Sequence, residues 1–190
     1  VMAAAQPGHY LAFFPSYSYL QQVWEDFTAR YPDQPTLCQE SAMDEGQRTE
    51  FLAQFLARDG KPLLGFAVLG GVFGEGVDLT GESLIGVAVV SPGLPQIGPR
   101  QEQLRDYFEE TRGAGFDYAY RYPGMNKVLQ AAGRVIRTPQ DRGVVLLIDD
   151  RFLAPDTRRL MPPHWEHLRV VDSADAWKDE LAAFWKKHEP

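Results

Sequence analysis

Four short, continuous apolar runs constrain the fold of this chain more than any other feature. They cover residues 10–14, 63–69, 84–90 and 144–148. An unbroken apolar run of this length, flanked by turn residues, is typical of a strand buried on both faces of a parallel sheet. Helical patterns alternate with these runs. The sequence therefore predicts a three-layer αβα domain with a mainly parallel sheet and right-handed crossovers.

Capping residues predict where the helices begin and end. Ser16 predicts a helix through about residue 30, and Asp44 one through about residue 58, because their side chains satisfy the first free amides of a helix. Pro99 suits the first turn of a helix that ends near Gly113. Pro139 would end a further helix that precedes it.

Less regular stretches separate and follow these elements. The segment 91–124 is rich in proline and glycine and is too long for a plain connector, so it predicts an irregular insertion. A weaker strand is expected over 168–171, followed by a closing helix over 172–187. The whole chain, 1–190, is expected to form a single domain.

Composition narrows the possible functions. With 190 residues, 44% of them hydrophobic, the chain can bury one core. Its formal net charge of -7 argues against a stand-alone nucleic-acid binder, because nonspecific DNA affinity comes mainly from lysine and arginine, so any grip on DNA must be local or shared. The single cysteine excludes an internal disulfide, and no stretch resembles a signal peptide or a membrane span. These features predict a cytoplasmic protein without a membrane partner.

One polar stripe suggests chemistry. Gln130, Arg134 and Arg137 stand at i, i+4 and i+7, so on a helix they would project together. Arginine forks hold phosphate oxygens bidentately, and a glutamine can position a water or a phosphate oxygen. The alternative is a helix face that is merely solvated. The residues expected to turn inward are Val128, Val135 and Ile136.

Four motifs stand in a known order. The glycine-rich acidic run 71–79 directly follows an apolar strand and resembles motif V of superfamily 2 helicases, and the run 130–137 resembles their motif VI. The sequence FFPSY at 13–17 and the sequence DDRF at 149–152 complete the pattern of the XPD/DinG-like DNA helicases. The resemblance covers residues 8–172. It implies a RecA-like domain of the P-loop NTPase type, the second of two motor domains.

The first motor domain of such helicases has no counterpart here. Its phosphate loop and its acidic magnesium motif are absent, since the only Gly-Lys pair, Gly60-Lys61, is followed by Pro62. Val1 ahead of an ordinary-looking Met2 likewise predicts a piece of a longer polypeptide. The resemblance therefore implies ATP and magnesium shared with a missing first domain. Many family members carry a four-cysteine iron-sulfur cluster in that first half, which this chain cannot hold.

The resemblance assigns the nucleotide to motifs V and VI. Gly74 and Gly76 would allow close backbone approach, while Glu75 and Asp78 would hold the motif VI arginines and contact the nucleotide sugar region. For Asp78, a turn cap is the alternative. In motif VI, Gln130 and Arg134 would face the γ-phosphate, and Arg137 would be the arginine finger that stabilises charge in the transition state.

Single-stranded DNA is the implied partner. The resemblance places Ser16 against the strand backbone, which is compatible with helix capping because a helix N-terminus attracts anions. Val72 and Phe73 would line the same track. Residues 116–122 alternate aromatic and other side chains, so Tyr118 and Tyr120 could stack on bases. The alternative is that these rings pack the segment onto the body.

Other candidate sites are weaker. His164 and His167 have no nearby cysteine or further histidine, so no metal site is predicted. The strand-end acids Asp149 and Asp150 are expected to cap or to pair with Arg151 rather than to hold a metal. Six aromatic residues at helical spacing are expected in the core, namely Trp24, Phe27, Phe51, Phe55, Trp177 and Trp185.

The sequence as a whole predicts one motor domain of an ATP-dependent DNA helicase. With the first RecA-like domain of the same polypeptide, it would couple ATP hydrolysis to translocation on single-stranded DNA and to duplex unwinding. Alone it is expected to be inactive, because half of the phosphate site is missing. The alternative is a noncatalytic helicase-like interaction module, against which the retained stripe of Gln130, Arg134 and Arg137 argues.

Overall fold

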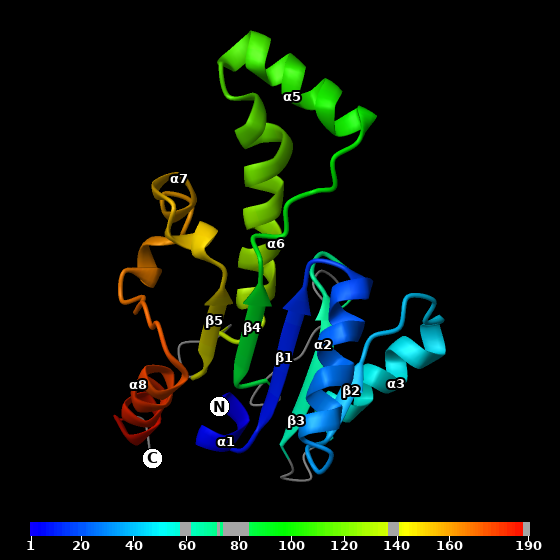
Figure 1. Cartoon of the computed structure of the whole chain (residues 1–190), viewed down its shortest axis with the longest axis vertical. Helices are drawn as coiled ribbons and strands as arrows, with labels where there is room; N and C mark the ends of the chain where they lie inside the picture. The colour runs from blue at the N-terminus through cyan, green and yellow to red at the C-terminus, as the bar shows by residue number, and fades with distance from the viewer. Residues whose placement is uncertain (58–61, 72, 74–83, 137–140, 188–190) are drawn as a thin grey trace.

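Five strands form one sheet in the order β2-β3-β1-β4-β5, and each pairing is parallel (Figure 1). The computed structural model describes residues 1–57, 62–71, 73, 84–136 and 141–187. The strands are β1 (His9–Phe14), β2 (Thr36–Cys38), β3 (Leu63–Val68), β4 (Gly86–Val90) and β5 (Val144–Ile148). All four apolar runs are thus confirmed as strands. The short edge strand β2 was not predicted, because three half-buried residues carry no pattern of their own.

Helices connect and cover the strands. They are α1 (Met2–Ala5), α2 (Tyr17–Arg30), α3 (Glu45–Leu56), α5 (Pro99–Arg112), α6 (Tyr122–Ala132), α7 (Pro155–Arg158) and α8 (Ala174–Lys187). The predicted caps are confirmed: the Ser16 hydroxyl accepts from the Tyr19 amide at 3.3 Å, and Asp44 exchanges two 2.8 Å hydrogen bonds with Gln47. None of the helices in the described ranges is long and apolar enough to cross a membrane.

The two faces of the sheet are covered by different helices, which gives the predicted αβα layers. Leu11 and Phe13 of β1 point toward α3 and α6, whereas Ala12 and Phe14 point toward α2. Helices α1 and α8 extend the second layer around Tyr10. The six aromatic residues expected in the core all pack there: Phe51 and Phe55 are buried, and Trp24, Phe27, Trp177 and Trp185 are partly buried.

Two expectations about the less regular stretches are wrong. Segment 91–124 is largely helical: it contains α5, a π-helix at Asp117–Arg121 and the start of α6, and it projects beyond the carboxyl ends of the strands (Figure 1). Its glycine and proline residues act as helix ends, since Pro99 opens α5 and Gly113 closes it at φ 62. Residues 168–171 form no strand, and Val170 is 62% exposed.

Candidate functional site

Polar residues gather where the parallel strands end. Because all carboxyl ends lie at one edge of the sheet, the residues after the strands become neighbours there, as is usual for ligand sites in open α/β sheets. The residues that follow β1, β2, β3, β4 and β5 at this edge include Ser16, Gln39, Gly70, Ser91 and Asp149. We call this set of strand ends the carboxyl edge.

Gln39 joins three elements at the carboxyl edge. Its side chain is buried, its Nε2 donates to the Tyr17 hydroxyl at 2.9 Å, and its Oε1 accepts from the Val68 amide at 2.8 Å. Its backbone amide donates to the Phe66 carbonyl at 2.8 Å. The start of α2, which carries Ser16, is therefore fixed relative to β2 and β3. No sequence signal identified Gln39, because a lone glutamine after a short strand has no distinctive spacing.

Asp149 and Arg151 form a second polar group at the carboxyl edge. Arg151 donates from Nε to Asp149 Oδ1 at 2.8 Å, and from Nη2 to Asp149 Oδ2 at 2.7 Å and to Ser91 Oγ at 3.0 Å. The hydrogen bond from Arg151 lowers the pKa of Asp149 and raises that of Arg151. Ser91 is held at φ 76, a left-handed conformation that is uncommon for a residue with a side chain. The predicted pairing of Asp149 with Arg151 is confirmed.

Motif VI occupies the end of α6. Gln130 is exposed in the last turn, and Val128 and Val135 are buried as expected. The helix stops at Ala132 rather than before Pro139, because tighter turns replace its regular hydrogen bonds: the Arg134 amide donates to the Ala131 carbonyl at 3.2 Å.

Two details of the predicted stripe change as a result. Arg134 lies just beyond the helix and is half-buried, and burial lowers the pKa of its guanidinium. Ile136 does not turn inward but is 47% exposed. Arg137 lies outside the described residues, so the geometry of the complete stripe stays a prediction.

Most of motif V also lies outside the described residues, namely Val72, Gly74, Glu75, Gly76 and Asp78. Phe73 is described, and its side chain is 1% exposed. Its ring packs against that of Phe51 in α3, with centroids 4.3 Å apart. The prediction that Phe73 lines a DNA track is therefore wrong for its side chain, because the ring belongs to the core.

The aromatic run 116–122 does not form a shared platform, because the π-helix distributes its rings around an axis instead of alternating them. Tyr120 is 5% exposed and donates its hydroxyl proton to Glu102, so it packs rather than stacks on a base. Tyr118 stays partly exposed, but its ring stacks on Phe108 with centroids 4.3 Å apart. The packing alternative therefore holds for Tyr120.

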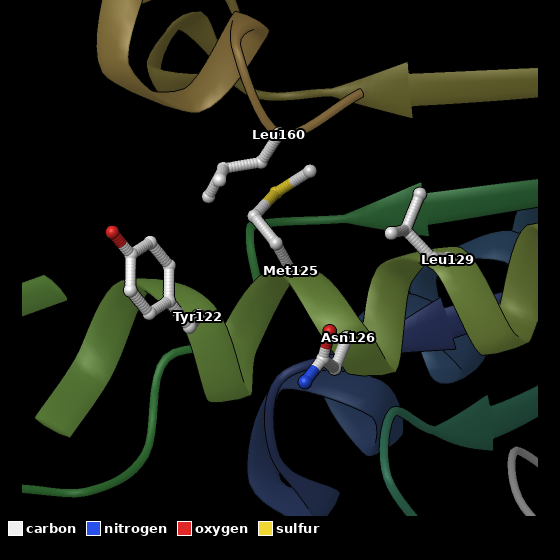
Figure 2. A pocket seen from close by; sticks show the side chains of 5 residues that line it. All are labelled: Tyr122, Met125, Asn126, Leu129 and Leu160. Carbon is white, nitrogen blue, oxygen red and sulfur yellow. The ribbon is translucent and has the colours of Figure 1, made fainter. Parts of the chain in front are cut away.

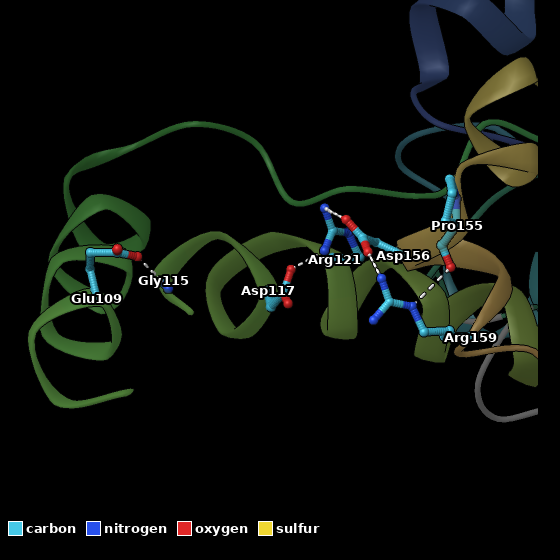
Figure 3. A network of polar contacts seen from close by, with 7 residues as sticks. All are labelled: Glu109, Gly115, Asp117, Arg121, Pro155, Asp156 and Arg159. Carbon is cyan, nitrogen blue, oxygen red and sulfur yellow. Dashed lines mark hydrogen bonds and ion pairs between the residues drawn. The ribbon is translucent and has the colours of Figure 1, made fainter. Parts of the chain in front are cut away.

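Ion pairs join this projecting segment to the body of the domain (Figure 3). Arg121 contacts Asp117 on its own π-helix and lies 3.6 Å from Asp156 of α7. Asp156 also pairs with Arg159. Close by, Tyr122, Met125, Asn126 and Leu129 of α6, with Leu160, line a cavity of about 310 Å³ (Figure 2). The start of α6 thus faces the α7 region, through the Arg121–Asp156 ion pair and through the cavity that α6 shares with Leu160.

Among the described candidates, Arg134 and Ser16 lie toward opposite ends of the sheet. Val135, next to Arg134, lies against Gly143 near the amino end of β5: a Cβ built on Gly143 would be 2.2 Å from Val135 Cγ1. Ser16 lies at the carboxyl edge. In the part of the chain that the structure describes, no group of three or more His, Cys, Asp or Glu residues could hold a metal ion.

Comparison with known proteins decides the family. The profile of the Helicase C-terminal domain family matches residues 1–168. The chain belongs to this family. The helicase C-terminal domain is 32% identical over 200 residues to regulator of telomere elongation helicase 1 of Bos taurus, and 30% identical over 161 residues to ATP-dependent DNA helicase chl-1 of Caenorhabditis elegans. These matches cover 95% and 80% of the chain but only 16% and 19% of the two relatives.

Solved structures agree on the fold of this helicase C-terminal domain. An XPD helicase superposes over 80% of the chain and 27% of its own length, with a TM-score of 0.62 at 20% sequence identity. Xpd4 of S. tokodaii superposes over 85% of the chain and 31% of its own length, with a TM-score of 0.55 at 16% identity. The predicted membership of the XPD/DinG-like helicases and the predicted RecA-like fold are confirmed.

Proposed function

We propose that this helicase C-terminal domain is the second motor domain of an ATP-dependent DNA helicase. The observation that carries the proposal is the placement of motif VI: Gln130 is exposed in the last turn of α6, and Arg134 comes four residues later, just past the end of the helix. An amide and a guanidinium that approach one ligand would match the oxygen-rich γ-phosphate of ATP. The first motor domain would supply the phosphate loop and the magnesium site.

Each motif VI residue then has a distinct task. Gln130 would orient the attacking water or a phosphate oxygen, and Arg134 would hold the γ-phosphate. Arg137 would act as the arginine finger, because a guanidinium stabilises the charge that spreads over the phosphoryl group as its bond breaks. The motif V residues Glu75 and Asp78 would orient these arginines and contact the sugar region, with Gly74 and Gly76 allowing close approach.

DNA would follow the carboxyl edge. The first-turn amides of α2 and the Ser16 hydroxyl form an anion-binding end suited to a backbone phosphate. Gln39 supports the proposal because its hydrogen bonds fix this end of α2 in place. Val72 stays part of the proposed track, and Tyr118 offers the partly exposed ring of the projecting segment. Translocation would require closure on the first domain and reopening after hydrolysis.

Steady-state ATP hydrolysis by the full-length polypeptide that carries this domain tests the proposal. Arg137→Ala should reduce the DNA-stimulated rate by roughly 10³-fold or more while leaving ATP and DNA binding largely intact, since it acts on the transition state. Arg134→Ala should behave similarly with some loss of nucleotide affinity. Arg169→Ala, at an exposed position outside both motifs, is the matched control.

Circular dichroism would verify folding of each variant. A folded Arg137→Ala protein that hydrolyses ATP at the parental rate would contradict the motor assignment. If the parental polypeptide itself hydrolysed no ATP, the domain would instead be assigned as a noncatalytic interaction module. The isolated domain should show no ATPase activity in either case, because it lacks the other half of the site.

A further inference from the structure

A lysine on α6 reaches the carboxyl edge at the end of β3. Lys127 lies one turn before Gln130, and its side chain crosses the backbone of Gly70 at the end of β3. A Cβ built on Gly70 would lie 2.7 Å from Lys127 Cδ, 2.8 Å from its Cε and 3.2 Å from its Nζ. The whole outer part of the lysine side chain therefore rests on this glycine, which adopts the left-handed φ of 75.

Gly70 and Ser16 follow two strands that pair with each other. Phe14 of β1 pairs with Val68 of β3, and Ser16 and Gly70 each come two residues after these strand ends. The Leu69 amide donates to the Phe14 carbonyl at 2.8 Å, so the residue just before Gly70 is still joined to the end of β1. Neighbouring strands lie about 4.8 Å apart, so the Lys127 ammonium and the Ser16 hydroxyl lie at the ends of adjacent strands on the carboxyl edge.

The charge of Lys127 is not neutralised within the described part of the domain. No hydrogen bond or ion pair joins its ammonium to any described residue, whereas Arg105, Arg121, Arg151, Arg159 and Lys178 each contact a carboxylate. The side chain is only half-exposed. A lysine that buries its stem and keeps its charge uncompensated presents a positive point charge to an external anion.

We propose that Lys127 contacts a backbone phosphate of single-stranded DNA next to the one held at Ser16. The inference rests on the proposed function, in which DNA follows the carboxyl edge. The nucleotide triphosphate offers the same phosphate chemistry. Lys127 nevertheless favours DNA, because its stem leads away from the end of α6 that carries Gln130 and Arg134, toward the end of β3, which pairs with the strand that leads to Ser16.

Salt-dependent binding by the 190-residue chain tests this contact. Fluorescence anisotropy with labelled oligo(dT) would compare the parent with Lys127→Met, which keeps the stem over Gly70 but removes the charge. Losing one phosphate contact reduces the steepness of log K against log salt by about 0.7. Between 50 and 200 mM salt, the affinity of Lys127→Met for oligo(dT) should therefore decrease by a factor about 2.6 times smaller than the factor for the parent. Lys127→Arg should retain the parental slope, and Lys186→Met on α8 is the matched control.

Acetylation of lysines, analysed by mass spectrometry, provides a second readout without any substitution. Oligo(dT) should protect Lys127, whereas ATP without DNA should not. Protection by ATP alone, or an unchanged slope for Lys127→Met, would overturn the contact while leaving DNA binding by the parent intact. If the parent chain showed no salt-sensitive binding to oligo(dT), both this contact and the proposed DNA path would be wrong.

Discussion

Replacing Phe51 by alanine would test how the core supports motif V. Phe51 of α3 is 4% exposed, and its ring lies 4.3 Å from that of Phe73 and 5.5 Å from that of Phe55. Phe73 immediately precedes Gly74 and Glu75, the proposed nucleotide-contacting residues of motif V. Phe51→Ala therefore removes the aromatic neighbour against which Phe73 is anchored, without touching any proposed site residue.

The expected cost follows from the burial. Removing a fully packed phenylalanine side chain destabilises a core by about 3–5 kcal/mol, which includes the cavity left behind. Each lost aromatic pair accounts for about 0.5–1.5 kcal/mol beyond area burial. With a urea m-value of about 2 kcal/mol/M, the midpoint of unfolding should fall by about 1.5–2.5 M. A domain stability of about 10 kcal/mol, the middle of the usual range, would leave about 5–7 kcal/mol, so the variant stays folded without denaturant.

Two assays together would decide the matter. Urea unfolding, followed by circular dichroism, gives the midpoint of unfolding. ATP hydrolysis by the full-length polypeptide gives the functional effect, and we expect a clear loss of ATPase activity because Phe73, at the start of motif V, loses its aromatic neighbour. Leu181→Ala is the matched control: Leu181 is 1% exposed but packs around Tyr10, away from Phe73. Equal losses of ATPase activity in both folded variants, or an unchanged midpoint for Phe51→Ala, would refute the reasoning.

Three further predictions concern single contacts. Arg151 lowers the pKa of Asp149 in the folded chain. The parent should therefore be more stable than Asp149→Asn above the unfolded aspartate pKa of about 3.9, and this difference should shrink as the pH falls below that value. Urea midpoints of the two proteins that differ more at pH 3 than at pH 7 would contradict this. Asp44→Ala should cost about 0.5–2 kcal/mol in the same assay and Asp44→Asn much less, because asparagine also caps a helix. Burial raises the pKa of Cys38 to about 11. Iodoacetamide should therefore modify Cys38 far more slowly at pH 8 in the folded chain than in the chain unfolded by urea. Equal modification rates would contradict this burial.

The strands and most helix ends were determined by the sequence because their signals are local. A continuous apolar run such as 144–148 needs only its own residues to indicate a buried strand, and β5 has the same limits. Likewise Ser16 and Asp44 cap α2 and α3 with side chains that bond amides three residues away. The family motifs are equally local strings, so the sequence alone indicates the helicase family.

Tertiary structure alone decided what each polar or aromatic side chain faces. Nothing near Phe73 in sequence shows that its ring enters the core, because its partner Phe51 belongs to a different helix. The alternating aromatic pattern predicts that Tyr120 is available for stacking, but the π-helix turns it toward Glu102. Gln39 and Lys127 carried no signal at all, since their contacts with Val68 and Gly70 arise only when the sheet and α6 come together. Contacts between residues distant in sequence depend on packing geometry, which a one-dimensional pattern does not encode.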